Sequence, residues 1–141
     1  MQASGIATTA YIVVGKNYRT DIAKYASAAQ EKINTSGNLP IGMTVKVEAS
    51  PIRKYAMMVR VDRETVSKEE VQGIIDNYTE WQDNTAGRAF NPERLIGDLY
   101  RAGCSSVSLS SVSGNTFTNL KFTKIEDKEH CEGTISVSYT T

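Results

Sequence analysis

The chain has 141 residues, a length that suits one domain or two very small ones with a buried core. Its 16 basic and 16 acidic side chains cancel to a formal net charge of zero. Proteins that bind nucleic acid usually carry a basic excess that neutralises phosphates, so this balance argues against that class. The longest apolar run, residues 10–14, is far too short to cross a bilayer, and no basic segment precedes it as in a secretory signal. We expect neither nucleic acid nor a membrane as a partner.

The first third of the chain predicts a strand, a helix and a second strand. Residues 9–14 are rich in β-branched and aromatic side chains, which is typical of a strand. Apolar residues then recur at helical spacing from Ile22 to Ile33, after Thr20 or Asp21 as a cap. Alternating apolar and polar residues predict a strand over residues 43–49.

The rest of the chain predicts a second, larger set of elements. A long strand is expected from Ile52 to Asp62, after the Ser50-Pro51 break. Ser67 with Glu70 three residues later forms a capping-box pattern, which opens a helix that ends near Gln82. The remaining expectations are a helix from the cap Asn91 to Gly103, a strand over residues 105–112, a strand or ordered loop over 116–125, a charged turn at 127–132 and a last strand from Gly133.

These elements predict an α+β fold made of two small consecutive strand-helix-strand units, with helices packed on mixed sheets. We expect the first unit to comprise residues 1–50 and the second to comprise residues 51–141. No residue-level repeat relates the two units, so they share only a similar plan.

The chain offers few residues that could carry out catalysis or bind a metal. Its only histidine, His130, stands beside Cys131 in a charged segment, and a surface loop position explains it better than a catalytic role. Cys104 and Cys131 are the only cysteines, and with one histidine they do not give the spacing of a zinc site. Two lone thiols suggest a reducing compartment, although a single bridge remains open. We therefore expect no enzyme activity, no cofactor and no metal.

Aromatic and arginine side chains gather around the polar segment that joins the second and third helices, which the sequence suggests is a hinge. This composition is typical of the centres of protein interfaces. Packing inside the domain is the alternative for the same aromatic residues. The candidate interface residues are Trp81, Asn84, Arg88, Phe90 and Arg94. If Trp81 contacts a partner, Trp81→Ala should weaken assembly more than folding.

Several segments together resemble the C-terminal part of baseplate J-like proteins, which build the wedge of contractile-tailed bacteriophage baseplates and related injection machines. The segments are TTAYIVVG, LPIGMTVKVEASP, YAMMVRVD, SKEEVQGIIDNYTEW, FNPERLIGDLYRAGCSSVSLSS and the terminal CEGTISVSYTT. Members of this family usually have an additional N-terminal core region that this sequence lacks. Whether the chain is a fragment or a shortened relative stays open, and contacts made through that region are not carried over.

The resemblance implies a structural role in the virion tail baseplate, after assembly in the host cytoplasm. Its implied partners are other wedge proteins and copies of the chain itself, arranged in a ring around the tail tube. Two other classes remain as alternatives. One is a ring-forming or adaptor module of a bacterial secretion apparatus, and the other is a regulatory domain that binds a small molecule.

Overall fold

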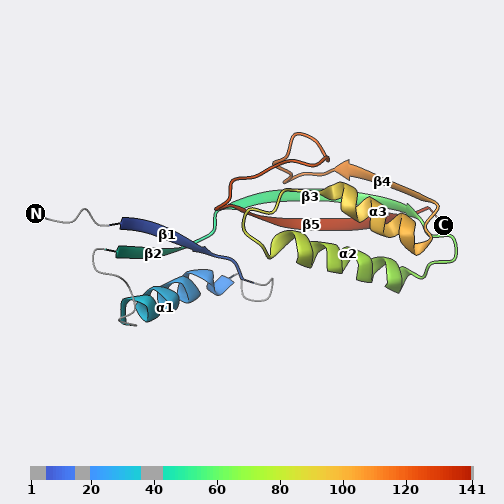
Figure 1. The fold of residues 1–141 in the computed structure, drawn as a ribbon. Coiled ribbons are helices and arrows are strands. Elements are labelled where there is room, and N and C mark those ends of the chain that lie inside the picture. Colours follow the sequence, from blue (N-terminus) through green and yellow to red (C-terminus); the bar gives the residue numbers. More distant parts are fainter. Residues whose placement is uncertain (1–5, 15–19, 36–42, 141) are drawn as a thin grey trace, which may run out of the picture. The chain divides into compact units, whose positions relative to one another are not determined.

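The computed structural model describes residues 6–14, 20–35 and 43–140. Within these residues it has three helices and two sheets, one of them mixed, and the helices pack on the sheets (Figure 1). This arrangement confirms the expected α+β class. The chain divides into two compact units, Met1–Pro51 and Ile52–Thr141.

The first unit is a strand-helix-strand motif. β1 (Ile6–Ile12) and β2 (Met43–Ala49) pair in parallel, and α1 (Ile22–Thr35) packs against β2. Gln30 of α1 fastens the helix to this strand, because its Nε2 donates to the Val45 carbonyl at 2.8 Å and its Oε1 accepts from the Val47 N–H at 2.6 Å. A helix side chain thereby pairs two backbone groups of the strand, which would otherwise need other partners.

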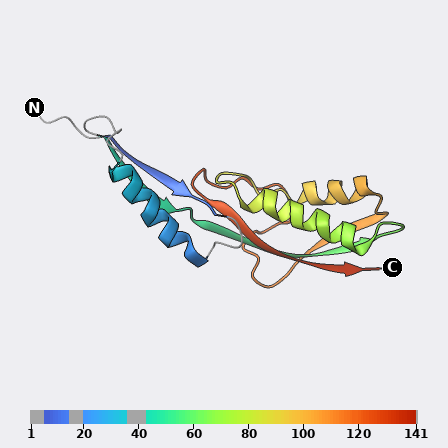
Figure 2. The same ribbon diagram turned by 90° about the horizontal axis from the view of Figure 1, so that it is seen from below.

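The second unit is built on a three-stranded mixed sheet. β3 (Ile52–Asp62) is the central strand, with antiparallel β4 (Ser106–Ser111) on one side and parallel β5 (His130–Tyr139) on the other. Figures 1 and 2 show α2 and α3 lying together over the same face of this sheet. α2 contacts β5, and α3 contacts β4.

The two helices of this unit begin and end where local chemistry favours it. α2 (Lys68–Asp83) starts after Ser67, whose Oγ accepts from the Glu70 N–H at 3.1 Å, as the capping pattern predicts. α3 (Pro92–Ala102) ends at Gly103, whose φ of 116° is the left-handed conformation that glycine tolerates best. Asn91 is the N-cap residue of α3 and Pro92 follows it at the start of the helix, as expected, but the Asn91 side chain makes no capping hydrogen bond.

The core of the second unit lies between the sheet and the two helices. Alternate β3 residues turn their side chains toward the helices, from Tyr55 to Val61, and each is at most 1% exposed. They pack against buried apolar residues of both helices, of the segment that joins the helices and of the loop that precedes β5. These are Val71, Ile75, Tyr78, Leu95, Leu99, Phe90 and Phe117.

The segment before β5 differs from the sequence expectation. β5 begins at His130, three residues before the expected start at Gly133, because β3 supplies pairing partners from Ile52 onward. The stretch 116–125 has no named strand, and its only bridge joins Thr123 to Phe90.

Candidate partner-binding site

Three of the residues that the sequence singles out come together where α2 meets α3. Trp81 lies in the last turn of α2, Arg94 in the first turn of α3, and Arg88 in the segment that joins the helices. The Arg94 guanidinium carbon lies over the Trp81 ring at 4.1 Å from its centroid, and that of Arg88 at 4.4 Å. We call these three residues the Arg-Trp-Arg cluster. Each cation over an indole stabilises the arrangement by about 0.5–2 kcal/mol, depending on exposure.

The cluster is partly open to solvent and rests on the core. Trp81 and Arg88 are half-buried, and Arg94 is exposed. The indole meets the buried Tyr78 ring edge-on, with centroids 6.2 Å apart and an interplanar angle of 86°. The edge-to-face contact with Tyr78, a geometry that aromatic pairs favour, therefore holds one side of the tryptophan in place. The rest of the ring keeps some surface exposed to solvent.

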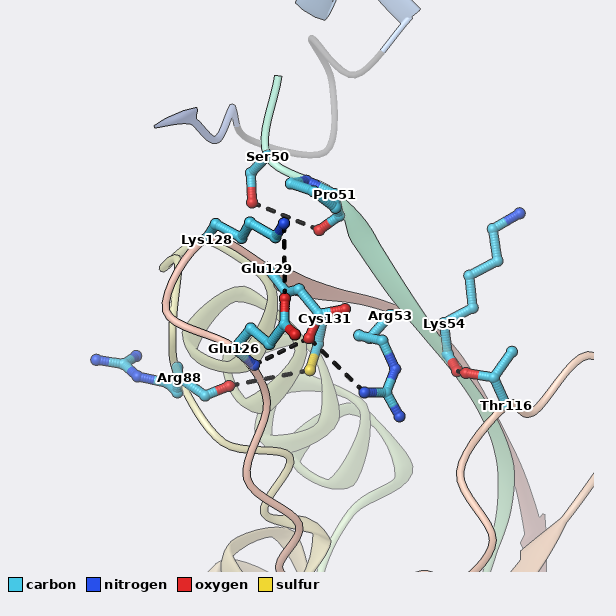
Figure 3. A network of polar contacts seen from close by, with 10 residues as sticks. All are labelled: Ser50, Pro51, Arg53, Lys54, Arg88, Thr116, Glu126, Lys128, Glu129 and Cys131. Carbon is cyan, nitrogen blue, oxygen red and sulfur yellow. Dashed lines mark hydrogen bonds and ion pairs between the residues drawn. The ribbon is translucent and has the colours of Figure 1, made fainter. Parts of the chain in front are cut away.

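Arg88 is held through its backbone, whereas its guanidinium reaches outward. Its carbonyl accepts a weak hydrogen bond from the Cys131 thiol at 4.0 Å, and its guanidinium donates to the Trp81 carbonyl at 2.6 Å. Figure 3 shows the Arg88 carbonyl facing Cys131 and the guanidinium extending away from it. The neighbouring Gly87 N–H donates to the Glu129 carbonyl at 2.7 Å. These contacts fix the chain on both sides of the arginine.

Glu129 in turn anchors the loop that Gly87 touches. Its carboxylate accepts from the Glu126 N–H at 2.9 Å and lies 3.7 Å from the Arg53 guanidinium of β3 (Figure 3). The loop is thus tied to the central strand of the sheet.

Gln82 links the end of α2 to the start of α3 from inside the core. This residue is fully buried. Its Nε2 donates to the Ala89 carbonyl at 2.9 Å, and its Oε1 accepts from the Asn91 N–H at 2.8 Å and from the Tyr78 hydroxyl at 3.1 Å. The segment that the sequence suggests is a hinge is therefore fastened by buried hydrogen bonds, which position Arg88 and Arg94 against Trp81.

Asp83 fastens the same helix end to the sheet. This buried carboxyl accepts from the Tyr55 hydroxyl at 2.8 Å and from the Gly133 N–H at 3.1 Å. Burial, with the nearby Asp83 carboxylate, raises the pKa of Tyr55 far above its ordinary value, so the hydroxyl stays a donor. The cluster therefore sits on a rigid corner of the second unit.

The other two expected interface residues do not belong to the Arg-Trp-Arg cluster. Asn84 is exposed at the C-terminal cap of α2. Phe90 is 0% exposed, stacks on Phe117 with centroids 4.2 Å apart and bridges Thr123 through its backbone. The expectation that Phe90 contacts a partner is wrong, because core packing takes up the whole ring.

His130 does not occupy the surface loop that the sequence suggests. It is 1% exposed at the start of β5, and its Nε2 lies 2.8 Å from the Glu132 carboxylate. The Cys131 thiol contacts the Arg88 carbonyl instead, on the opposite face of the strand, since successive strand residues point to opposite faces. His130 and Cys131 therefore do not form the contact that a cysteine nucleophile and its base would need.

Both cysteines are buried free thiols. Burial raises the pKa of Cys104, and burial raises the pKa of Cys131 to about 12, with Asp83 as the second cause. Neither thiol has the lowered pKa of a reactive cysteine. In the described ranges, no three histidine, cysteine or acidic side chains gather as a metal site would require.

Sequence reasoning missed the buried polar residues that support the cluster. Gln82 follows Ile75 by seven residues and Tyr78 by four, which places it on the apolar stripe of the helix. A polar residue at such a position indicates a buried side chain that needs hydrogen-bond partners. Asp83 and Gly133 gave no comparable local signal, because their contacts join α2 to β5.

Comparison with known proteins adds no family assignment. No protein-family model matches the chain, and no curated protein matches it. Across the part of the chain that the structure describes, no helix has the length and apolar character needed to cross a membrane.

Proposed function

We propose that this protein is a structural assembly module that docks on partner proteins through the Arg-Trp-Arg cluster. The assembly we propose is the baseplate of a contractile phage tail, where the chain joins other wedge proteins and copies of itself. The observation that carries the docking role is a partly exposed tryptophan held under two guanidinium groups on a rigid corner of the fold.

Tryptophan and arginine are the residues most enriched among those that dominate binding energy at protein interfaces. Such side chains bind tightly only when little conformational freedom is lost, at roughly 0.5–1.5 kcal/mol for each side chain that becomes ordered. Trp81 and Arg88 are already ordered by their stacking and by the Arg88 hydrogen bond to the Trp81 carbonyl. Folding has therefore already restricted these side chains, so little further conformational entropy is lost when a partner binds.

The baseplate assignment is the finer part of the proposal and rests on the sequence resemblance. The segments that carry it include the long strand YAMMVRVD, which forms most of β3, and FNPERLIGDLYRAGCSSVSLSS, which forms α3 and β4. Of the cluster residues, Arg94 lies in the last of these segments, and Trp81 ends another resembling segment, SKEEVQGIIDNYTEW. A module that uses its side chains for shape and contact suits a ring built by repeated docking.

Immunogold electron microscopy can test the baseplate role. Antibodies raised against the purified chain should label the baseplate end of contractile-tail particles made by cells that express it. Label on the tail tube, on the capsid or on no particle would contradict the assignment.

Assembly of variants can test the docking role separately. Trp81→Ala should reduce incorporation of the chain into particles at least tenfold, because one central interface tryptophan contributes about 2 kcal/mol or more. Phe122→Ala is the matched control, since Phe122 is an aromatic side chain with 54% exposure outside the cluster. Equal incorporation of the two variants, both folded by circular dichroism, would contradict docking through Trp81.

A further inference from the structure

We propose that the Arg-Trp-Arg cluster recognises an acidic segment of its partner protein, in which a carboxylate binds Arg88 and Arg94 and a neighbouring apolar side chain contacts Trp81. This inference rests on the proposed docking function and adds the chemistry of the partner. It follows from the unneutralised charge of the cluster.

The two guanidinium groups of the cluster form no ion pair within the described residues. Among the described residues of the second unit, the basic side chains that form ion pairs include those of Arg53, Arg101 and Lys128. The Arg94 guanidinium donates no hydrogen bond to a described residue, and the Arg88 guanidinium donates only to the Trp81 carbonyl. Most of the ten guanidinium N–H donors of the pair are therefore available, five on each arginine.

Two like charges share one aromatic ring in this arrangement. Both guanidinium carbons lie within 4.4 Å of the Trp81 centroid, so their separation is comparable with the screening length of about 8 Å at physiological salt. Their mutual repulsion is then only partly screened. A carboxylate bound beside them would relieve it and would accept paired hydrogen bonds from a planar guanidinium.

The surroundings favour a protein segment over a nucleic acid. Glu80 and Glu93 are exposed neighbours of Trp81 and Arg94 in the sequence, and they would repel a continuous run of phosphates. The whole chain has a formal net charge of zero, which gives no long-range attraction for a polyanion. Two arginines around one indole instead match a local pair of features, one carboxylate and one apolar side chain.

The test uses Trp81 as its own reporter, because it is the only tryptophan in the chain. Its indole N–H gives a single resonance in a proton-nitrogen correlation spectrum of the full chain. The probe is a short blocked peptide in which two glutamates flank a leucine, and the reference is the same peptide with glutamines. We expect a saturable shift of the indole resonance with the glutamate peptide, which weakens as salt increases, and at least a tenfold weaker response with the glutamine peptide.

Two arginine variants of α3 form a matched pair, in which Arg94→Gln is the test and Arg101→Gln is the control. Arg94→Gln should weaken binding of the glutamate peptide about tenfold. Arg101→Gln should leave it unchanged, because Arg101 is exposed on α3 outside the cluster and pairs with Asp98 at 3.1 Å. The remaining resonances of each variant report whether it is folded.

The proposal is overturned if the glutamate peptide gives no saturable shift up to about 10 mM, or if the glutamine peptide binds equally well. Tighter binding of a single-stranded oligonucleotide than of the glutamate peptide would also overturn it and assign the cluster to nucleic acid. If Trp81→Ala impairs particle assembly while the acidic peptide does not bind, the docking function stands and only the acidic partner is refuted. If the peptide binds but Trp81→Ala assembles normally, the docking function fails instead.

Discussion

Gly133 of β5 lies directly opposite Tyr55 of β3 and provides the sharpest test of how the second unit is packed. A Cβ atom added to this glycine would overlap with three atoms of the Tyr55 ring, Cζ, Cε1 and Cε2, all well inside the 3.0 Å that real Cβ contacts keep. Moving the Tyr55 ring aside would cost free energy, because the ring is enclosed by other groups. Tyr55 is 1% exposed, and its ring centroid lies 5.1 Å from that of Phe90. Its hydroxyl donates a hydrogen bond to Asp83.

The expected cost of Gly133→Ala follows from these contacts. Overpacking a filled core costs about 1–3 kcal/mol. Displacing the ring would also break the buried hydrogen bond to Asp83, which adds about 1–3 kcal/mol. We expect Gly133→Ala to lower the free energy of unfolding of the second unit by about 2–6 kcal/mol, a large part of the ~5–15 kcal/mol typical of a domain.

Urea unfolding followed by Trp81 fluorescence measures this change. Gly73→Ala is the matched control, because a Cβ at Gly73 would meet nothing within 4 Å and the residue lies inside α2. Alanine replaces glycine favourably in a helix interior, so this variant should gain about 0.5–1 kcal/mol. The reasoning is refuted if Gly133→Ala unfolds within about 0.5 kcal/mol of the parent, a difference typical of a neutral surface change.

Three further predictions concern Asp83, which accepts from the Gly133 N–H, and Cys131, which lies two residues before this glycine. Asp83→Ala should destabilise the second unit by about 3 kcal/mol, because it leaves the Tyr55 hydroxyl and the Gly133 N–H buried without their acceptor. Asp76→Ala on the exposed face of α2 is its control in the same urea assay, and equal effects of the two variants would contradict the role of the Asp83 contacts. The Cys131 thiol, with its pKa raised from 9.0 to about 12, should resist iodoacetamide at pH 8 until urea unfolds the chain, as judged by peptide mass mapping. The folded state binds the Cys131 proton up to a higher pH than the unfolded state does. The contribution of Cys131 to folding stability should therefore be fully present below pH 9 and be lost as the pH rises toward 12. A free energy of unfolding that increases over this range would oppose the prediction.

The elements with strong local patterns are those that sequence reasoning located best. The long strand Ile52–Asp62 and the strand Met43–Ala49 have the bounds expected from their apolar patterns. The start of α2 followed from Ser67, whose side chain caps the N–H of Glu70. In each case the information is carried by residues within a few positions of one another, so no knowledge of the tertiary structure is needed.

The start of β5 shows where local patterns fail. Residues 127–132 are charged and predict a solvated turn, yet His130 and Glu132 belong to the strand. Pairing with β3 supplies hydrogen-bond partners whatever the side chains are. The local charge pattern therefore predicts that His130 is exposed to solvent. In the structure, pairing with the distant strand β3 holds it in a buried position.

The candidate site was found only in part for a similar reason. Arginine and aromatic composition identified Trp81, Arg88 and Arg94, but the same composition also selected Phe90. The stack on Phe117, far along the chain, decides that Phe90 belongs to the core. Gln82 and Asp83, which fix the corner beneath the cluster, have partners that a linear pattern does not reveal.

The sequence by itself determined the class of fold, the order of most elements and the region where arginines and aromatic residues gather. The tertiary structure alone decided the strand order β4-β3-β5, the burial of Phe90 and His130, and the meeting of Arg88 and Arg94 over one indole. The physical reason is one of range. Helix caps and apolar periodicity depend on residues within one element, whereas strand pairing and side-chain stacking depend on how separate elements pack against one another.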